Sequence, residues 1–149
     1  MKKILIIEDD DFKAQSLRDV FSTQSHDYHV THVGALSEAI SEINENEYFL
    51  ILVDMAIPSH PSKVGGGSPI SLLTGGIDIL LELQYLGRSD PCIVVTQYPD
   101  IEISQGFYGL DEAPAVLNSE LGCSVLACIK YDDENNEWEK QLSEILIKL

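Results

Sequence analysis

Apolar runs of the sequence end in side chains that could do chemistry. Five polar side chains stand at such ends: Glu8, Asp9, Asp54, Thr96 and Lys130. The runs lack polar alternation, which favours strands covered on both faces, as in a parallel sheet. Sites in open parallel α/β sheets form beyond the carboxyl ends of the strands. We therefore expect three acids, a hydroxyl and an ammonium to converge at one edge of a sheet.

The elements that must position these side chains alternate in type along the chain. Continuous apolar or β-rich runs predict strands at 3–7, 28–33, 49–53, 92–95 and 124–129. Apolar residues at helical spacing separate most of these runs, and the clearest stripe lies at 138–149. Alternating strands and helices predict a three-layer α/β sandwich with right-handed crossovers.

Composition narrows the class of protein. A chain of 149 residues forms one domain with a substantial core. Its net charge of −16 disfavours direct binding to nucleic acid or anionic lipid, because phosphate contacts need Lys and Arg. No apolar run has the length of a membrane helix, and acids follow the first run too soon for a signal peptide. Three cysteines without a CxxC pair are consistent with the reducing cytoplasm.

Four short motifs resemble the receiver domain of two-component response regulators. They are "ILIIEDD", "ILVDMAIP", "VVTQ" and "CIKYD", in that family's order and on the expected elements. Any one motif is weak, whereas four in order are specific. The resemblance covers residues 1–149 as a single domain. It implies a flavodoxin-like five-stranded parallel sheet with strand order 2-1-3-4-5.

The resemblance also implies roles for the residues at the sheet edge. Asp54 would accept a phosphoryl group from a phosphohistidine of a sensor histidine kinase or phosphotransfer protein. Mg²⁺ would bind Asp9, Asp54 and the backbone carbonyl of Ala56 directly, and Glu8 through a water. The Thr96 hydroxyl and the Lys130 ammonium would bind phosphoryl oxygens. The output would be altered binding of a downstream effector protein, with no catalysis beyond the domain's own phosphorylation and dephosphorylation.

A divalent cation would account for the acids that directly follow the first apolar run. Two carboxylates about 4 Å apart repel by roughly 4 kcal/mol at an effective dielectric of 20. Mg²⁺ is a hard cation that takes oxygen ligands and keeps bound waters, so it could neutralise such a cluster. We expect Asp10 and Asp11 to be solvated acids at the start of the first helix, where the helix dipole favours them.

Two positions depart from the pattern of the family. The family's lysine is usually followed by proline, often through a cis bond, but Tyr131 follows Lys130. Because a cis bond before a non-proline residue costs about 3–4 kcal/mol, we predict a trans bond that could move the ammonium. The family's aromatic switch residue would fall at Ala127, which has no ring. Either the signal leaves by another route, or Tyr98 or Tyr131 substitutes.

Two long segments separate the motifs. Residues 59–76 follow the acceptor and are rich in Gly, Ser and Pro, which predicts a long loop. We interpret this loop as a lid or a partner-docking element, the alternative being a surface insertion without a role. Residues 97–122 carry Gly106, Gly109 and Pro114, so we expect any helix there to be interrupted. In the family this region includes a face often used for dimers, so a homodimer is possible.

The main alternative is a pseudo-receiver, an interaction module that keeps the fold without productive phosphorylation. "VGGGSP" lacks the Gly-Lys-Ser/Thr of a phosphate-binding loop. No Gly-x-Ser-x-Gly elbow supports a hydrolase, and no phosphate loop after the first run supports flavin binding. The four histidines lack companions at metal-binding spacing and are expected at the surface.

Overall fold

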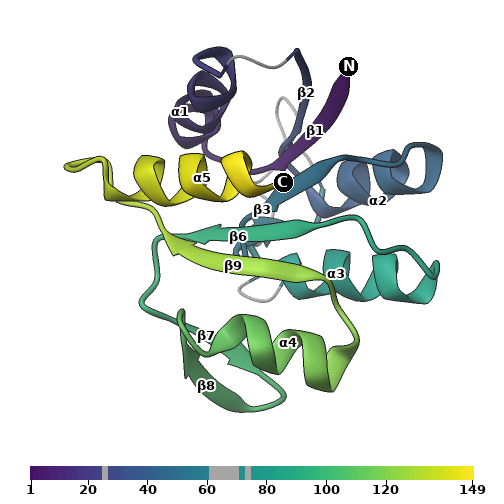
Figure 1. The fold of residues 1–149 in the computed structure, drawn as a ribbon. Helices are drawn as coiled ribbons and strands as arrows, with labels where there is room; N and C mark the ends of the chain where they lie inside the picture. The colour runs from purple at the N-terminus through teal and green to yellow at the C-terminus, as the bar shows by residue number, and fades with distance from the viewer. Residues whose placement is uncertain (25–26, 61–70, 73–74) are drawn as a thin grey trace, which may run out of the picture.

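A parallel sheet forms the centre of the computed structural model, which describes residues 1–24, 27–60, 71–72 and 75–149. Five strands run in the order β2-β1-β3-β6-β9 (Figure 1). They are β1 (Lys2–Ile7), β2 (Tyr28–Val33), β3 (Leu50–Val53), β6 (Cys92–Thr96) and β9 (Val125–Lys130). Counted among themselves, these strands have the order 2-1-3-4-5, which confirms the predicted flavodoxin-like topology.

Helices cover both faces of the sheet (Figure 1). On one face lie α1 (Asp11–Ser22) and α5 (Glu137–Lys148), which bury Leu17, Phe21, Trp138 and Leu142 against the sheet. On the other lie α2 (Leu36–Glu45), α3 (Gly75–Tyr85) and α4 (Ala113–Leu121). Alternate residues of β1 point into the two clusters, which is why that strand is apolar without a polar face. The predicted three-layer sandwich is confirmed.

Strand register aligns the carboxyl ends at one edge. Ile7 pairs with Val53, and Thr96 pairs with Lys130. The backbone N–H of Asp54 donates to the carbonyl of Ile7 at 3.1 Å, so the residues after β1 and β3 start side by side. The predicted convergence of strand ends is therefore present in the backbone.

The segment after Asp54 contains more structure than the predicted long loop. A two-residue strand β4 (Ile57–Pro58) pairs antiparallel with β5 (Ser71–Leu72), so the chain returns to the point where it departed. Residues 61–70 and 73–74 lie outside the described part of the chain. The lid or docking role predicted for 59–76, and the "VGGGSP" motif within it, therefore remain largely outside the description.

The second long segment, residues 97–122, contains a β-hairpin that was not predicted from the sequence. Strands β7 (Asp100–Ile103) and β8 (Gly106–Gly109) pair antiparallel around a two-residue turn at Ser104 and Gln105, both with positive φ. Such a turn matches the twist of hairpin strands. The prediction of an interrupted helix is wrong. Gly106 and Gly109 belong to the hairpin, and Pro114 lies in the first turn of α4. Proline is well tolerated there, since that N–H has no partner within the helix.

Candidate functional site

Three acids meet at the ends of β1 and β3. Glu8, Asp9 and Asp54 each offer a carboxylate oxygen, and these oxygens lie within 4.8 Å of one another. Glu8 is buried, Asp54 is half-buried and Asp9 is exposed, so the cluster opens toward solvent on one side. The structure thus brings together the three acids predicted to surround a metal. Ala56 lies two residues after Asp54 in the same connection, before β4.

The chemistry of this cluster fits a hard divalent cation. Oxygen donors from three carboxylates suit Mg²⁺ or Mn²⁺. Glu8 Oε2 is buried and has no hydrogen-bond partner among the described residues. A buried carboxylate oxygen without a partner is costly, and a cation or its bound water would satisfy it. The cluster could therefore hold a metal ion.

Burial and repulsion by neighbouring carboxylates disfavour the charged forms of Glu8 and Asp9. The pKa of Glu8 is raised to about 9, chiefly by burial and also by the nearby Asp54 carboxylate, while Lys13 opposes the shift. Burial also raises the pKa of Asp9, with smaller contributions from Asp54 and Asp10. A bound cation would reverse both effects, because it favours the ionised carboxylates.

A lysine that the sequence reading did not single out lies inside the cluster. Lys13 is only 1% exposed to solvent. Its Nζ lies 3.3 Å from Glu8 Oε1 and 3.6 Å from Asp54 Oδ1. Nζ also donates to the backbone carbonyl of Val95 at 2.8 Å. One signal could have found it: Lys13 starts the buried stripe of α1 that continues at Leu17.

The local structure fixes where Lys13 lies. Asp10 is the N-cap of α1, and its carboxylate accepts a hydrogen bond from the backbone N–H of Lys13 at 3.0 Å. Asp11 lies in the first turn of the helix. Both acids therefore stand at the helix start, as expected, and Asp10 in addition stabilises the turn that carries Lys13.

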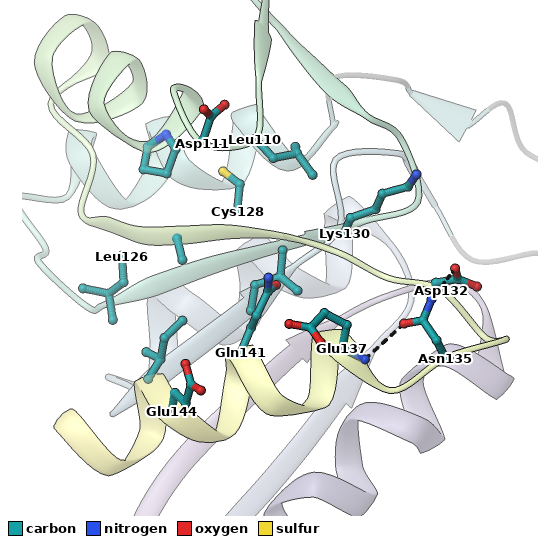
Figure 2. A pocket seen from close by; sticks show the side chains of 14 residues that line it. Leu110, Asp111, Leu126, Cys128, Lys130, Asp132, Asn135, Glu137, Gln141 and Glu144 are labelled. Atoms are coloured by element: carbon teal, nitrogen blue, oxygen red, sulfur yellow. Dashed lines mark hydrogen bonds between the residues drawn. The ribbon is translucent and has the colours of Figure 1, made fainter.

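Lys130 makes no ion pair with the acid cluster among the described residues. Its side chain is exposed, and no ion pair involves it in the described part of the chain. It lines a groove of about 780 Å³ between β9, α4 and α5, which also includes Asp111, Leu126 and Glu144. Figure 2 shows Lys130 extending from the end of β9 on the opposite side of the strand from Glu137. The structure therefore brings the three acids together, whereas the Lys130 ammonium makes no ion pair with them.

Thr96 lies at the expected end of β6. The residue is fully buried, and its Oγ1 accepts a hydrogen bond from the backbone N–H of Tyr98 at 3.1 Å. This bond fixes the first turn after β6. The hydroxyl is therefore held at the sheet edge that carries the acids.

Tyr98 and Tyr131, the two residues that could replace the missing aromatic ring at position 127, lie in different environments. Ala127 packs half-buried against the cluster beneath α1 and α5. Tyr98 is 51% exposed, whereas Tyr131 is buried, with its ring centroid 5.5 Å from Lys13 Nζ and 5.0 Å from the Trp138 ring. The Lys130–Tyr131 bond is trans, as predicted.

His32 is a further residue beside the site. Its Nε2 lies 2.6 Å from the backbone carbonyl of Glu8, so it stabilises the chain just after β1. The sequence reading expected the histidines at the surface, and His29 on the same strand is exposed. His32 is half-buried instead, and it pairs with Ile6 of β1.

The fold and the acid cluster together define a response-regulator receiver domain. The solved Mn²⁺-bound form of the response regulator Rcp1 matches 97% of this chain and 91% of its own, with a TM-score of 0.66 and 17% identity. The response regulator TrrA from Thermotoga maritima, in complex with Mg²⁺-BeF, matches 99% of this chain and 98% of its own, with a TM-score of 0.64 and 18% identity. Both likenesses concern the fold.

Sequence similarity assigns the chain to a family. It is 31% identical over 152 residues to the Detocs response regulatory protein DtcB of Vibrio alginolyticus, a match that covers 96% of this chain and 98% of that protein. The chain belongs to the response-regulator family. No sequence-family model matches it. None of the helices in the described part of the chain combines the length and apolar content that a membrane crossing requires.

Proposed function

We propose that this receiver domain accepts a phosphoryl group on Asp54 from a phosphohistidine of a sensor histidine kinase or phosphotransfer protein. The observation that carries the proposal is the clustering of Glu8 and Asp9 around Asp54. Of the three acids, Asp54 follows the central strand β3. The neighbouring strand β6 ends at Thr96. Phosphorylation would change the binding of an effector protein.

The reaction is a group transfer that needs positioning more than covalent chemistry. An Asp54 carboxylate oxygen attacks phosphorus, the phosphorus–nitrogen bond to the donor imidazole breaks, and the imidazole leaves with that electron pair and takes up a proton. Charge on the three equatorial oxygens must be neutralised. Mg²⁺, when bound, would supply Lewis-acid neutralisation, and Asp9, Asp54, the Ala56 carbonyl and Glu8 through a water would hold it.

The residues of this chain supply the rest. The Thr96 hydroxyl, fixed by its bond to the Tyr98 N–H, stands at the sheet edge where a phosphoryl oxygen would lie. The partly exposed Asp54 remains open to a donor. The domain would catalyse only its own phosphorylation and dephosphorylation, in the cytoplasm and without contact to nucleic acid or membrane.

The second candidate function is a pseudo-receiver that binds a partner without being phosphorylated. The exposed position of Lys130 and the alanine at position 127 favour it, since both depart from the machinery that the resemblance implies. The clustering of the three acids favours the phosphorylated receiver, because a domain that only binds a partner would gain nothing from repelling carboxylates.

Incubation with phosphoramidate and Mg²⁺, followed by intact mass measurement, separates the two functions. A phosphoryl-sized gain is expected in the wild type and not in Asp54→Ala. Asp78→Ala removes an acid from α3 as a matched control and should keep the gain. Absence of any gain in the wild type with several small phosphodonors would favour the pseudo-receiver.

A further inference from the structure

We propose that Lys13, from the first turn of α1, supplies the ammonium that binds the phosphoryl group on Asp54, in place of Lys130. The inference rests on the proposed function and deepens it by assigning a residue to the site. The resemblance to the family gave this role to the lysine at the end of β9. In this chain the ammonium beside the acceptor comes from a different element.

The first support is the position of the Lys13 ammonium. Nζ lies 3.6 Å from Asp54 Oδ1 and 3.3 Å from Glu8 Oε1, so it is beside the carboxylate of the proposed acceptor. An ammonium has three donors. One is used by the Val95 carbonyl at 2.8 Å, which leaves the other two facing the carboxylates. A phosphoryl oxygen on Asp54 would enter this same space and accept from Nζ.

The second support is that the Lys13 side chain is fixed in place. Lysine is almost never fully buried unless it is paired. Lys13 is among the largest fully buried side chains of the described residues, and its partners are Glu8 and Asp54. The Asp10 cap fixes its backbone, and the Tyr131 ring lies 5.5 Å from Nζ at its other side. An ammonium that is already positioned needs little reorganisation when charge develops on the phosphoryl oxygens.

The third support is the register of β9. The Tyr131 N–H donates to the Thr96 carbonyl at 2.8 Å, so strand pairing continues past Lys130. Successive side chains of a strand point to opposite faces. Because Tyr131 packs against Trp138 beneath α1 and α5, Lys130 points to the other face and lies exposed beside the groove in Figure 2. A one-residue slip would be needed to exchange the two side chains.

Lys13 also offsets part of the negative charge of the site. In the absence of a divalent cation its ammonium is the positive charge that contacts Glu8 and Asp54 among the described residues. During transfer, the new bond joins Asp54 oxygen to phosphorus, the bond to the donor nitrogen breaks, and Lys13 neutralises one equatorial oxygen. Lys13 keeps its proton throughout, so no further reactant is needed.

The test compares Lys13→Met with its matched control Lys130→Met, using phosphoramidate, Mg²⁺ and intact mass over time. Loss of a positioned donor typically costs about 10²-fold in rate, so Lys13→Met should slow phosphorylation of Asp54 to that extent. Lys130→Met should stay within about twofold, as for other exposed charges. The reverse pattern, or equal rates in all three proteins, would overturn the assignment to Lys13 and leave the proposed function intact. A wild type that takes up no phosphoryl group would overturn both.

A second readout is independent of phosphorylation. Trp138, the chain's lone tryptophan, packs on Tyr131 and so lies near Lys13. Its fluorescence should report titration with Mg²⁺, and Lys13→Met should bind the ion more tightly than Lys130→Met because a competing cation is gone. Thermal unfolding checks that each variant folds. If Lys13→Met does not fold, Lys13→Gln, whose amide can still donate to the Val95 carbonyl, takes its place with the same expected outcomes.

Discussion

The ammonium of Lys13 lies 3.6 Å from the carboxylate of Asp54, although the two residues come from different elements and are 41 positions apart, from 13 to 54. The contact places a cation from α1 at the end of the central strand. It offsets part of the repulsion among three acids. The acid cluster is therefore partly neutralised by the chain itself, and a divalent cation would complete the neutralisation.

Removing an acid from the cluster should weaken the binding of Mg²⁺. Asp9→Asn deletes one charged ligand, and loss of groups that merely support a metal ligand already costs about 10–100-fold in affinity. We therefore expect at least a tenfold rise in the Mg²⁺ dissociation constant, measured by calorimetry or by Trp138 fluorescence. Asp11→Asn makes the same charge change in the first turn of α1 and should leave affinity nearly unchanged. Equal affinities in Asp9→Asn and wild type would exclude Asp9 as a ligand.

Stability without divalent cations should fall as pH rises. Burial raises the pKa of Glu8 to about 9 in the folded protein, against 4.5 for the free side chain. Between these values the folded state binds more protons than the unfolded state, so the free energy of unfolding decreases with pH. The slope cannot exceed about 1.4 kcal/mol per pH unit for one proton.

Urea unfolding in chelator at several pH values between about 5 and 9 measures this slope. Glu8→Gln removes the titrating group, so its slope should be flatter than that of the wild type. Added Mg²⁺ should also reduce the wild-type slope, because a bound cation favours the ionised form. A wild-type slope unchanged by Glu8→Gln would contradict the assigned pKa shift.

The sheet and its helices could be predicted because burial on two faces leaves a strong mark on the sequence. The runs of β1, β3 and β6 are almost wholly apolar, and the Trp138–Leu142–Leu146 stripe of α5 has helical spacing. The acids of the site could be found as well, since each follows such a run. These features are local in sequence, and local patterns are what periodicity detects.

The ammonium could not be assigned from sequence because its location depends on tertiary contacts. A lysine in the first turn of a helix is usually solvated, and only the packing of α1 against the sheet buries Lys13. The face of β9 that Lys130 occupies could not be predicted for the same reason, because the burial of Tyr131 decides it. The β7–β8 hairpin was missed because Gly106 and Gly109 were interpreted as helix breakers rather than strand residues.

Acid should weaken the fold through Asp90. Burial alone would raise the pKa of this carboxyl, but hydrogen bonds from Arg88 and from the Tyr48 N–H outweigh it and the pKa is lowered. A lowered folded-state pKa contributes stability above the unfolded value, and the contribution is lost as pH falls through the folded value. Arg88 also donates to the carbonyls of Ile43 and Asn46, so this network joins the end of α2 to the start of β6.

Asp90→Ala should lower the free energy of unfolding by about 2–3 kcal/mol at neutral pH, since it leaves charged and backbone donors without their acceptor. The difference from wild type should shrink below about pH 4, where the carboxyl is protonated in the unfolded chain. Glu102→Ala, an exposed acid on β7, serves as the control and should change stability little. A deficit in Asp90→Ala that persists unchanged at low pH would show that its carboxylate charge is not the cause.

Gly76 should tolerate no side chain, because α3 begins directly against the acceptor strand. A Cβ at this position would lie 2.5 Å from the Asp54 carbonyl oxygen and 2.9 Å from Met55 Cα, both backbone atoms that cannot turn away. The Gly76 N–H also donates to the Met55 carbonyl at 3.0 Å, which holds the helix start close to β3. Gly76→Ala must therefore displace either the helix or the residue that carries the acceptor carboxylate.

We expect Gly76→Ala to lower the free energy of unfolding by about 1–3 kcal/mol, the usual cost of overpacking, measured by urea denaturation. It should also slow phosphorylation of Asp54, since the acceptor backbone must shift. Gly34→Ala is the matched control: its nearest neighbour, the Glu8 carbonyl oxygen, would lie at an ordinary 3.5 Å. That variant should be neutral or slightly stabilised, because alanine restricts the unfolded chain. Equal stability of the two variants would mean that the contact between α3 and the end of β3 is looser than these distances indicate.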